Sequence, residues 1–364
     1  MADEAETLDG FLIRDVAVVD RETFAFTAIG DPSRSRWTES GTLPENVPAR
    51  VIAYLTETDF WGYLDYTPSS LFKSAGGTRS DGRKQACFAS TSGSVAVFNF
   101  GADQSGHETD LPRGAAVSDL RFIDGQYYAV GGNDFLGRRE AEGTWTVRRM
   151  SETRDWKNPA HQFIDGYGAD DLYLLPENDL AVLHGDGQEM TRFPFPEDSF
   201  KTDQQKDFVP LSMCAAPDGT VYIGGNDGRL IAGRAPSGFV QMIPFDPAQQ
   251  NRRIHNLVWF QETLWATFGA GLARLVNGKW EVMEFPGDPE APTSFRYMDA
   301  RDGVLLVAGE SAGWYYNGEI WRQVFGISVD EILQIKNMEK NVEGLQALID
   351  SAKRLRELRR NAGR

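Results

Sequence analysis

A module of forty-odd residues recurs along the chain, and this repeat constrains the fold more than any other feature of the sequence. Each copy has an apolar strand, a tight turn, a second apolar strand that ends near glycine, a third short strand, another glycine turn and a fourth strand. Five copies align when their second strands are registered on Tyr127, Leu172, Val221, Leu264 and Val304. Because four-stranded propeller blades have repeat lengths of about 40–50 residues, the pattern predicts an all-β propeller.

The turns between these strands have the composition that a blade requires. Asp218-Gly219 and Asp302-Gly303 fit two-residue hairpin turns, where positive φ favours Asp-Gly between apolar strands. Asn277-Gly278 and Asn317-Gly318 fit the turns from a third to a fourth strand. A β-sandwich would not repeat a four-strand module at fixed spacing, and the coils of a parallel β-helix are far shorter. The turn chemistry therefore favours the propeller over both alternatives.

The first 115 residues repeat less clearly but still read as strands. Phe11–Asp20, Thr23–Gly30, Arg50–Leu55 and Phe60–Tyr66 are apolar runs, and ACFAST and SVAVFNF follow them. This length allows two irregular blades, which gives about seven four-stranded blades in total, with six or eight as alternatives. We predict a flexible acidic N-terminus over residues 1–10, a propeller over 11–327 and an amphipathic helical tail over 328–364.

This organisation resembles the superfamily of Kelch-like, WD40-like and bacterial regulator-type β-propellers. The resemblance extends over nearly the whole body through repeat length and turn pattern. The sharper signatures of these families, a Gly-His…Trp-Asp motif or a Ser-x-Asp-x-Gly-x-Thr-Trp box, are missing. The resemblance implies an architecture, with an end face or the central channel as the usual binding site, and implies no specific activity.

The C-terminal tail has the pattern of an amphipathic helix. Ser328 is suited to cap its start, with Asp330 and Glu331 in the first turn. Apolar residues then follow at alternating spacings of three and four, which places them on one stripe: Ile335, Met338, Val342, Leu345, Ile349 and Ala352. The stripe could dock on the propeller, pair with a second copy or a partner helix, or lie on a membrane surface.

The chain is strongly acidic, with 53 Asp and Glu against 37 Lys and Arg, a net charge of −16. This charge repels phosphate backbones and anionic lipid and favours a basic protein partner, although it could also serve solubility alone. Cys87 and Cys214 lie in apolar runs and suit no disulfide framework. The sequence has no basic leader followed by an apolar stretch, and no apolar run of about eighteen residues that would span a membrane. We therefore expect a cytoplasmic location without nucleic-acid binding.

A search for catalytic or metal-binding groups favours a binding protein over an enzyme. Residues counted back from the registered strands toward the channel are Asp119, Ile164, Met213, Asn256 and Arg296. This set offers few oxygen ligands, and the arginine would repel a cation. The sequence has no Gly-x-Ser-x-Gly elbow and no phosphate-binding Gly-x-x-x-x-Gly-Lys loop. We expect no cofactor, while a metal-dependent hydrolase or lyase acting in the channel remains the alternative.

The candidate partner-binding residues lie at the channel and in aromatic loops. His161 and His255 fall near the starts of two predicted innermost strands and would share one end of the channel. Tryptophans near charges at predicted blade connections fit interface anchors, or else packing between blades. The full set is Asp119, His161, His255, Asn256, Arg296, Trp37, Trp61 and Trp156. The hypothesis is a non-enzymatic propeller, in its most specific form an inhibitor or immunity protein that neutralises a basic partner through an acidic face.

Overall fold

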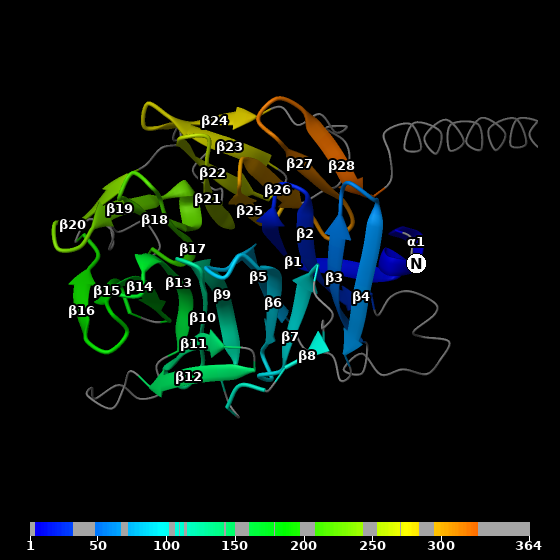
Figure 1. Cartoon of the computed structure of the whole chain (residues 1–364). Coiled ribbons are helices and arrows are strands. Elements are labelled where there is room, and N and C mark those ends of the chain that lie inside the picture. Colours follow the sequence, from blue (N-terminus) through cyan, green and yellow to red (C-terminus); the bar gives the residue numbers. More distant parts are fainter. Residues whose placement is uncertain are drawn as a thin grey trace, which may run out of the picture.

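The computed structural model describes residues 4–31, 48–66, 72–101, 106–108, 110–112, 115–141, 143–149, 160–177, 179–196, 208–242, 253–269, 271–283 and 295–326. Within these ranges the chain forms seven four-stranded antiparallel sheets arranged as the blades of a propeller (Figure 1). Each blade uses four strands that are consecutive in the sequence. The predicted fold class and the expected number of about seven blades are confirmed.

The strands follow one another around the ring. Blade 1 contains β1 (Phe11–Asp20), β2 (Thr23–Gly30), β3 (Ala49–Leu55) and β4 (Phe60–Tyr66). Blade 2 contains β5 (Phe72–Thr78), β6 (Lys84–Ser90), β7 (Val95–Phe100) and β8 (Gly106–His107). Blade 3 contains β9 (Val117–Ile123), β10 (Gln126–Gly131), β11 (Phe135–Ala141) and β12 (Thr144–Arg149). Blade 4 contains β13 (His161–Gly168), β14 (Asp171–Pro176), β15 (Ala181–Gly185) and β16 (Met190–Pro194).

The remaining three blades complete the ring. Blade 5 contains β17 (Pro210–Ala215), β18 (Val221–Gly225), β19 (Leu230–Arg234) and β20 (Gly238–Met242). Blade 6 contains β21 (Asn256–Phe260), β22 (Thr263–Phe268), β23 (Gly271–Val276) and β24 (Lys279–Met283). Blade 7 contains β25 (Tyr297–Arg301), β26 (Val304–Ala308), β27 (Gly313–Tyr316) and β28 (Trp321–Phe325). The five second strands registered in the sequence are β10, β14, β18, β22 and β26.

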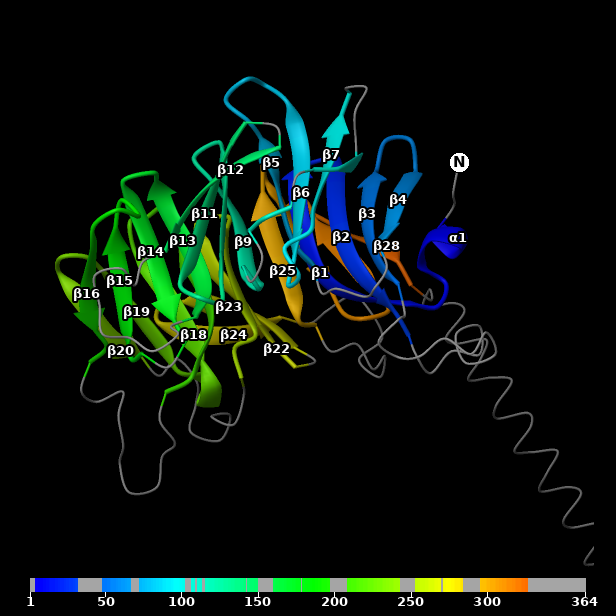
Figure 2. The same ribbon diagram turned by 90° about the horizontal axis from the view of Figure 1, so that it is seen from below.

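The first strand of each blade lies nearest the axis, and neighbouring blades meet mainly through these inner strands (Figure 1). The meander places two kinds of connection on opposite faces. Turns from first to second and from third to fourth strands gather on what we call the short-turn face, seen edge-on at the top of Figure 2. Connections from second to third strands and from blade to blade leave from the opposite side, the long-connection face.

The turns confirm one sequence prediction and correct another. Asp302 and Gly303 have φ values of 49° and 76°, so they form the predicted two-residue turn. Gly219 has a φ of 86°, but the Ala216 amide donates to the Thr220 carbonyl oxygen at 2.9 Å, so the loop between them has three residues. Pro217 explains the difference, because its fixed φ suits the first central position of a type I turn that glycine in the left-handed region then completes.

Blades 1 and 7 close the ring without sharing a strand. Their seam is a buried cluster in which the Phe26 and Phe325 rings meet edge-on at 5.4 Å. The Val18 amide donates to Asp299 at 2.7 Å, and the Ile13 amide donates to the Glu310 carbonyl oxygen at 2.8 Å. Side-chain packing and a few cross-blade hydrogen bonds therefore hold the ring shut.

The stretch over residues 1–10, predicted to be flexible, contains a short helix among its described residues. Residues Glu4–Leu8 form a short helix, α1, that contacts β4. Thr7 is fully buried, and its carbonyl oxygen accepts a hydrogen bond from Arg50 at 2.6 Å. The physical reason is the buried Arg50 guanidinium, which needs more acceptors than Asp65 alone supplies.

The two cysteines are buried in the core, where burial raises the pKa of Cys87 to about 12. The predicted C-terminal helix over 328–364, with its stripe from Ile335 to Ala352, lies outside the described residues. Of the helices that the structure does describe, none is long and apolar enough to cross a membrane.

Candidate functional site: the channel and the short-turn face

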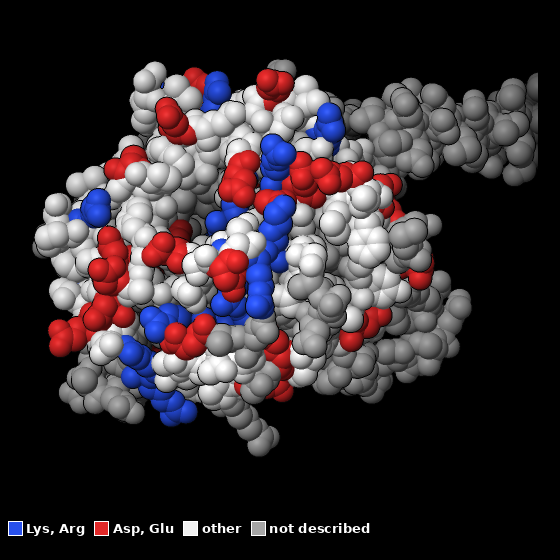
Figure 3. Space-filling view, viewed as in Figure 1, with Lys and Arg blue, Asp and Glu red and all other residues white. Residues whose placement is uncertain are grey.

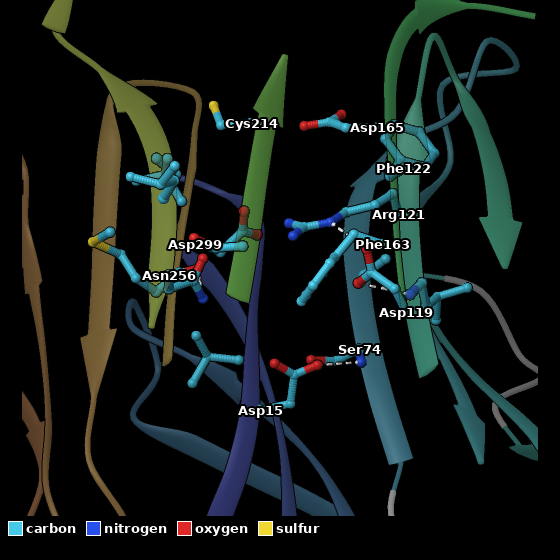
Figure 4. Close-up of a pocket in the computed structure, with 18 of the residues that line it drawn as sticks. Asp15, Ser74, Asp119, Arg121, Phe122, Phe163, Asp165, Cys214, Asn256 and Asp299 are labelled. Carbon is cyan, nitrogen blue, oxygen red and sulfur yellow. Dashed lines mark hydrogen bonds and ion pairs between the residues drawn. The ribbon is translucent and has the colours of Figure 1, made fainter. Parts of the chain in front are cut away.

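A cavity of about 530 Å³ runs along the propeller axis. All seven inner strands contribute side chains to its wall, which Figure 4 shows in part. The wall carries unusually many charges for an interior surface. Its carboxylates are Asp15, Asp119, Asp124, Asp165 and Asp299, and its cations are Lys73, Arg121, Arg296 and Arg301.

Four of the carboxylates join one blade to the next. Each accepts a hydrogen bond from a backbone amide of the following inner strand. The pairs are Asp15 with Ser74 at 2.8 Å, Asp119 with Ile164 at 3.0 Å, Asp165 with Ala215 at 2.8 Å, and Asp299 with Val18 at 2.7 Å. Asn256 adds a fifth link by donating to the Met298 carbonyl oxygen at 3.1 Å. These side chains therefore have a structural task before any binding role.

Arg121 is the central cation of the channel and points into it from β9 (Figure 4). Its Nε lies 3.3 Å from Asp119 Oδ2. Burial would lower the pKa of Arg121, but the carboxylates of Asp119, Asp165, Asp299 and Asp15 raise it above the ordinary value. Burial also raises the pKa of Asp15 and of Asp165, and nearby cations oppose this shift only in part. Four of the five channel carboxylates thus act on the charge of Arg121.

The structure brings four of the predicted site residues to this channel. Asp119, His255, Asn256 and Arg296 all line the cavity. Asp119 is buried and Asn256 partly buried, and both are engaged between blades, whereas Arg296 is exposed. His161 begins β13, so its backbone lies at the same end as His255.

The structure does not place any of the three predicted tryptophan anchors on a binding surface among the described residues. Trp61 is only 2% exposed and packs against Tyr54 with ring centroids 4.4 Å apart, so it is a core residue and not a surface anchor. The reason is its place on β4, where the side chain faces the blade 1 core instead of a loop. Trp37 and Trp156 lie outside the described residues.

Sequence reasoning missed Arg121, Asp165 and Asp299, which occupy equivalent positions. Each pairs with the third residue of its blade's second strand, namely Tyr128, Tyr173 and Leu306. The fixed offset could not find them because it reaches the partner of the fifth residue of the second strand, as Asp119 pairs with Val130. In blades 4 and 7 the count is off by one further residue, because β13 contains a bulge and blade 7 was registered on the first residue of β26. A slip of one residue moves the selected position to the other side of the strand. The usable signal was the charge itself, since ionised residues are uncommon among the apolar residues of an inner strand.

A ring of acidic residues surrounds the channel on the short-turn face. The first hairpin turn of every blade carries at least one acidic residue: Glu22, Asp81, Asp124, Asp170, Asp218, Glu262 and Asp302. On blades 1 and 2, basic neighbours pair with these turns, as Arg21 does with Glu22 and Arg79 with Asp81. The acidic residues on blades 3–7 form no ion pair with a described residue. Figure 3 shows acidic side chains spread around a central band of basic ones.

Aromatic side chains lie inside this ring. Tyr222 and Trp259 stack at 6.3 Å with an interplanar angle of 19°, and both remain partly exposed. The Tyr222 hydroxyl donates to Asp218 at 3.2 Å. Across the channel, the Arg301 guanidinium lies 5.0 Å from the Phe122 ring centroid. We call this combination of unpaired acidic turns and mouth aromatics on blades 3–7 the acidic–aromatic rim.

Across the residues the structure describes, no three His, Cys, Asp or Glu side chains converge as metal ligands would. Asp119, one of the few oxygen donors that the sequence count offered, faces Arg121, and the Asn256 amide is directed at a backbone carbonyl.

Comparisons with known proteins agree with the fold and supply one sequence relative. No family model matches the chain. The Immune protein Tsi7 of Pseudomonas aeruginosa is 26% identical over 228 residues, which cover 60% of this chain and 69% of that protein. This level of identity points to a distant relationship.

Solved structures with the same architecture are numerous, and three illustrate it. YCF48 bound to D1 peptide superposes with a TM-score of 0.57 at 10% identity, covering 88% of this chain and 94% of that one. The β-propeller domain of the Trilobed protease from Pyrococcus furiosus, which has an open velcro topology, gives 0.53 at 9% identity, covering 88% and 97%. The WD40 propeller domain of Doa1 gives 0.52 at 11%, covering 82% and 90%. At these identities the likeness concerns the fold alone: the chain is a seven-bladed β-propeller.

Proposed function

We propose that this propeller is a non-enzymatic immunity-type protein that neutralises a basic protein partner by binding it on the acidic–aromatic rim. The observation that carries the proposal is the set of exposed carboxylates on blades 3–7 that form no ion pair with a described residue. Such charges repel one another in the free protein and gain most when a basic surface covers them.

The aromatic residues at the mouth give the same surface a means of holding a partner. Trp259 and Tyr222 offer rigid, amphipathic contact area, which is what central interface residues commonly provide. The surrounding carboxylates would steer a basic loop toward this centre and set the orientation of docking. The distant likeness to a protein named Immune protein Tsi7 supports the immunity role from a separate direction.

The test uses the product of the neighbouring open reading frame in the source genome as the probe. We expect the chain to restore growth of cells that express this product and to form a complex with it whose affinity falls as salt concentration rises. Failure to protect the cells, together with no detectable complex at low salt, would remove the immunity proposal.

Charge-neutralising variants locate the surface. The triple variant Asp124→Asn, Asp170→Asn, Glu262→Gln should bind about tenfold more weakly at low salt, mainly through slower association, and the difference should shrink at high salt. The matched control neutralises three acidic residues on the long-connection face: Asp110→Asn, Glu177→Gln and Asp227→Asn. Equal weakening by both sets would show a general charge effect and argue against the rim.

A further inference from the structure

The opposite mouth of the channel has the reverse charge. Arg253, His255 and Arg296 lie on the long-connection face where blades 6 and 7 begin, and the last two line the cavity. Neither arginine forms an ion pair with a described residue. Three basic side chains thus gather, without an anion among the described groups, on a protein whose net charge is −16.

The backbone holds these three residues firmly. Ile254, between Arg253 and His255, is fully buried and its amide donates to the Gly225 carbonyl oxygen at 3.0 Å. Arg253 and His255 flank this buried residue in the chain, and the His255 amide donates to the Thr267 carbonyl oxygen at 2.9 Å. Arg296 follows the buried Phe295, and its amide donates to the Ala308 carbonyl oxygen at 3.2 Å. Backbone hydrogen bonds to β18, β22 and β26 therefore position the site.

The basic neighbours of His255 affect its pKa. Partial burial and then the charges of Arg296 and Arg253 lower the pKa of His255. Of the other charged groups at this end, Lys73 faces Asp15, and the Glu310 carboxylate pairs with Arg14 across the blade seam. An anion placed among the three basic groups would remove their mutual repulsion, and arginine is well suited to hold oxyanions through paired hydrogen bonds.

Arg253, His255 and Arg296 form a second rim of the channel, which we call the basic rim. We propose that this basic rim binds an oxyanion, a phosphate or carboxylate group carried by a small molecule. The cavity of about 530 Å³ behind the rim has the volume of an ordinary small-molecule site. The channel carboxylates lie deeper, so they confine the anion to the rim. This site is separate from the acidic–aromatic rim and does not depend on the immunity function.

The experiment titrates the full chain with inorganic phosphate, with acetate and with chloride at matched ionic strength. The readout is the imidazole resonance of His255, assigned by its loss in His255→Asn. We expect a saturable response and a higher pKa of His255 in the bound state, because the anion favours the protonated ring. Response to phosphate alone assigns a phosphoryl ligand, response to acetate alone a carboxylate, and response to both a rim that accepts either.

Two variants make the test specific. Arg296→Gln should weaken the saturable response by about tenfold or more, as expected for a lost charge-assisted hydrogen bond. Arg274→Gln, which removes an exposed arginine that pairs with Glu281 on the outer part of blade 6, should leave it unchanged. An identical response to chloride, or full retention of the response in Arg296→Gln, would overturn the proposal.

Discussion

At the scale of single residues, Asp165 combines a structural bond with an energetic cost. Its carboxylate accepts the Ala215 amide, while burial raises its pKa above the ordinary 3.8. Consider pH values between the pKa of Asp165 in the unfolded chain and its higher pKa in the folded protein. In this window the native state binds more protons than the unfolded chain, so the contribution of Asp165 to stability falls as pH rises.

The substitution Asp165→Asn should abolish this pH dependence. Asparagine cannot ionise but can still accept the Ala215 amide through Oδ1. Thermal unfolding across mildly acidic to neutral pH should therefore show the wild-type midpoint falling relative to that of the variant as pH rises. Asp302→Asn, at an exposed turn, is the control and should run parallel to the wild type. A constant offset between wild type and Asp165→Asn would contradict the assigned pKa direction.

At the scale of strands, β5 shows how closely the inner strands approach one another. A Cβ atom on Gly76 would lie 2.8 Å from the Val18 carbonyl oxygen of β1. Backbone cannot yield as a flexible side chain does, so Gly76→Ala should lower the free energy of unfolding by about 1–3 kcal/mol. Gly106→Ala on β8 is the matched control, since nothing lies within 4 Å of its Cβ position. Chemical denaturation measures both, and equal stability of the two variants would contradict the close approach.

The strand pattern was largely predictable because alternation and turn residues are local properties. Phe11–Asp20 and Thr23–Gly30 coincide with β1 and β2, and all five registered positions fall on second strands. The channel was harder to predict. Asp119 and Asn256 were found because two-residue turns and regular strands preserve the count, whereas Arg121 lies two residues beyond the position that the count reaches.

Two other features depend on contacts between distant parts of the chain. The hydrophobic environment of Trp61 comes from β2, β3 and blade 7, which no local pattern specifies. The acidic ring is likewise invisible along the sequence, because its members are one blade apart and only closure of the propeller brings them to one face. Composition predicted an acidic protein that binds a basic partner, and the three-dimensional arrangement gathers acidic residues on one face.

At the scale of the whole molecule, the seam between blades 1 and 7 distinguishes this ring from one closed by a shared strand. Buried aromatic rings carry much of the seam, with Phe24 and Tyr315 5.2 Å apart and Phe26 against Phe325. Every other pair of neighbouring blades is also joined through the chain, whereas blades 1 and 7 meet only through non-covalent contacts, so we expect the ring to open first at this seam.

The substitution Phe325→Ala tests this weakness. Phe268→Ala is its counterpart within blade 6, because Phe268 is also buried and meets Trp280 edge-on at 5.6 Å. Both variants should lose about 3–5 kcal/mol of stability. Only Phe325→Ala should accelerate amide hydrogen exchange selectively in β1 and β25, the inner strands on either side of the seam. If exchange in these strands rises equally in both variants, the ring opens as a single cooperative unit and the seam is no weaker than any other blade boundary.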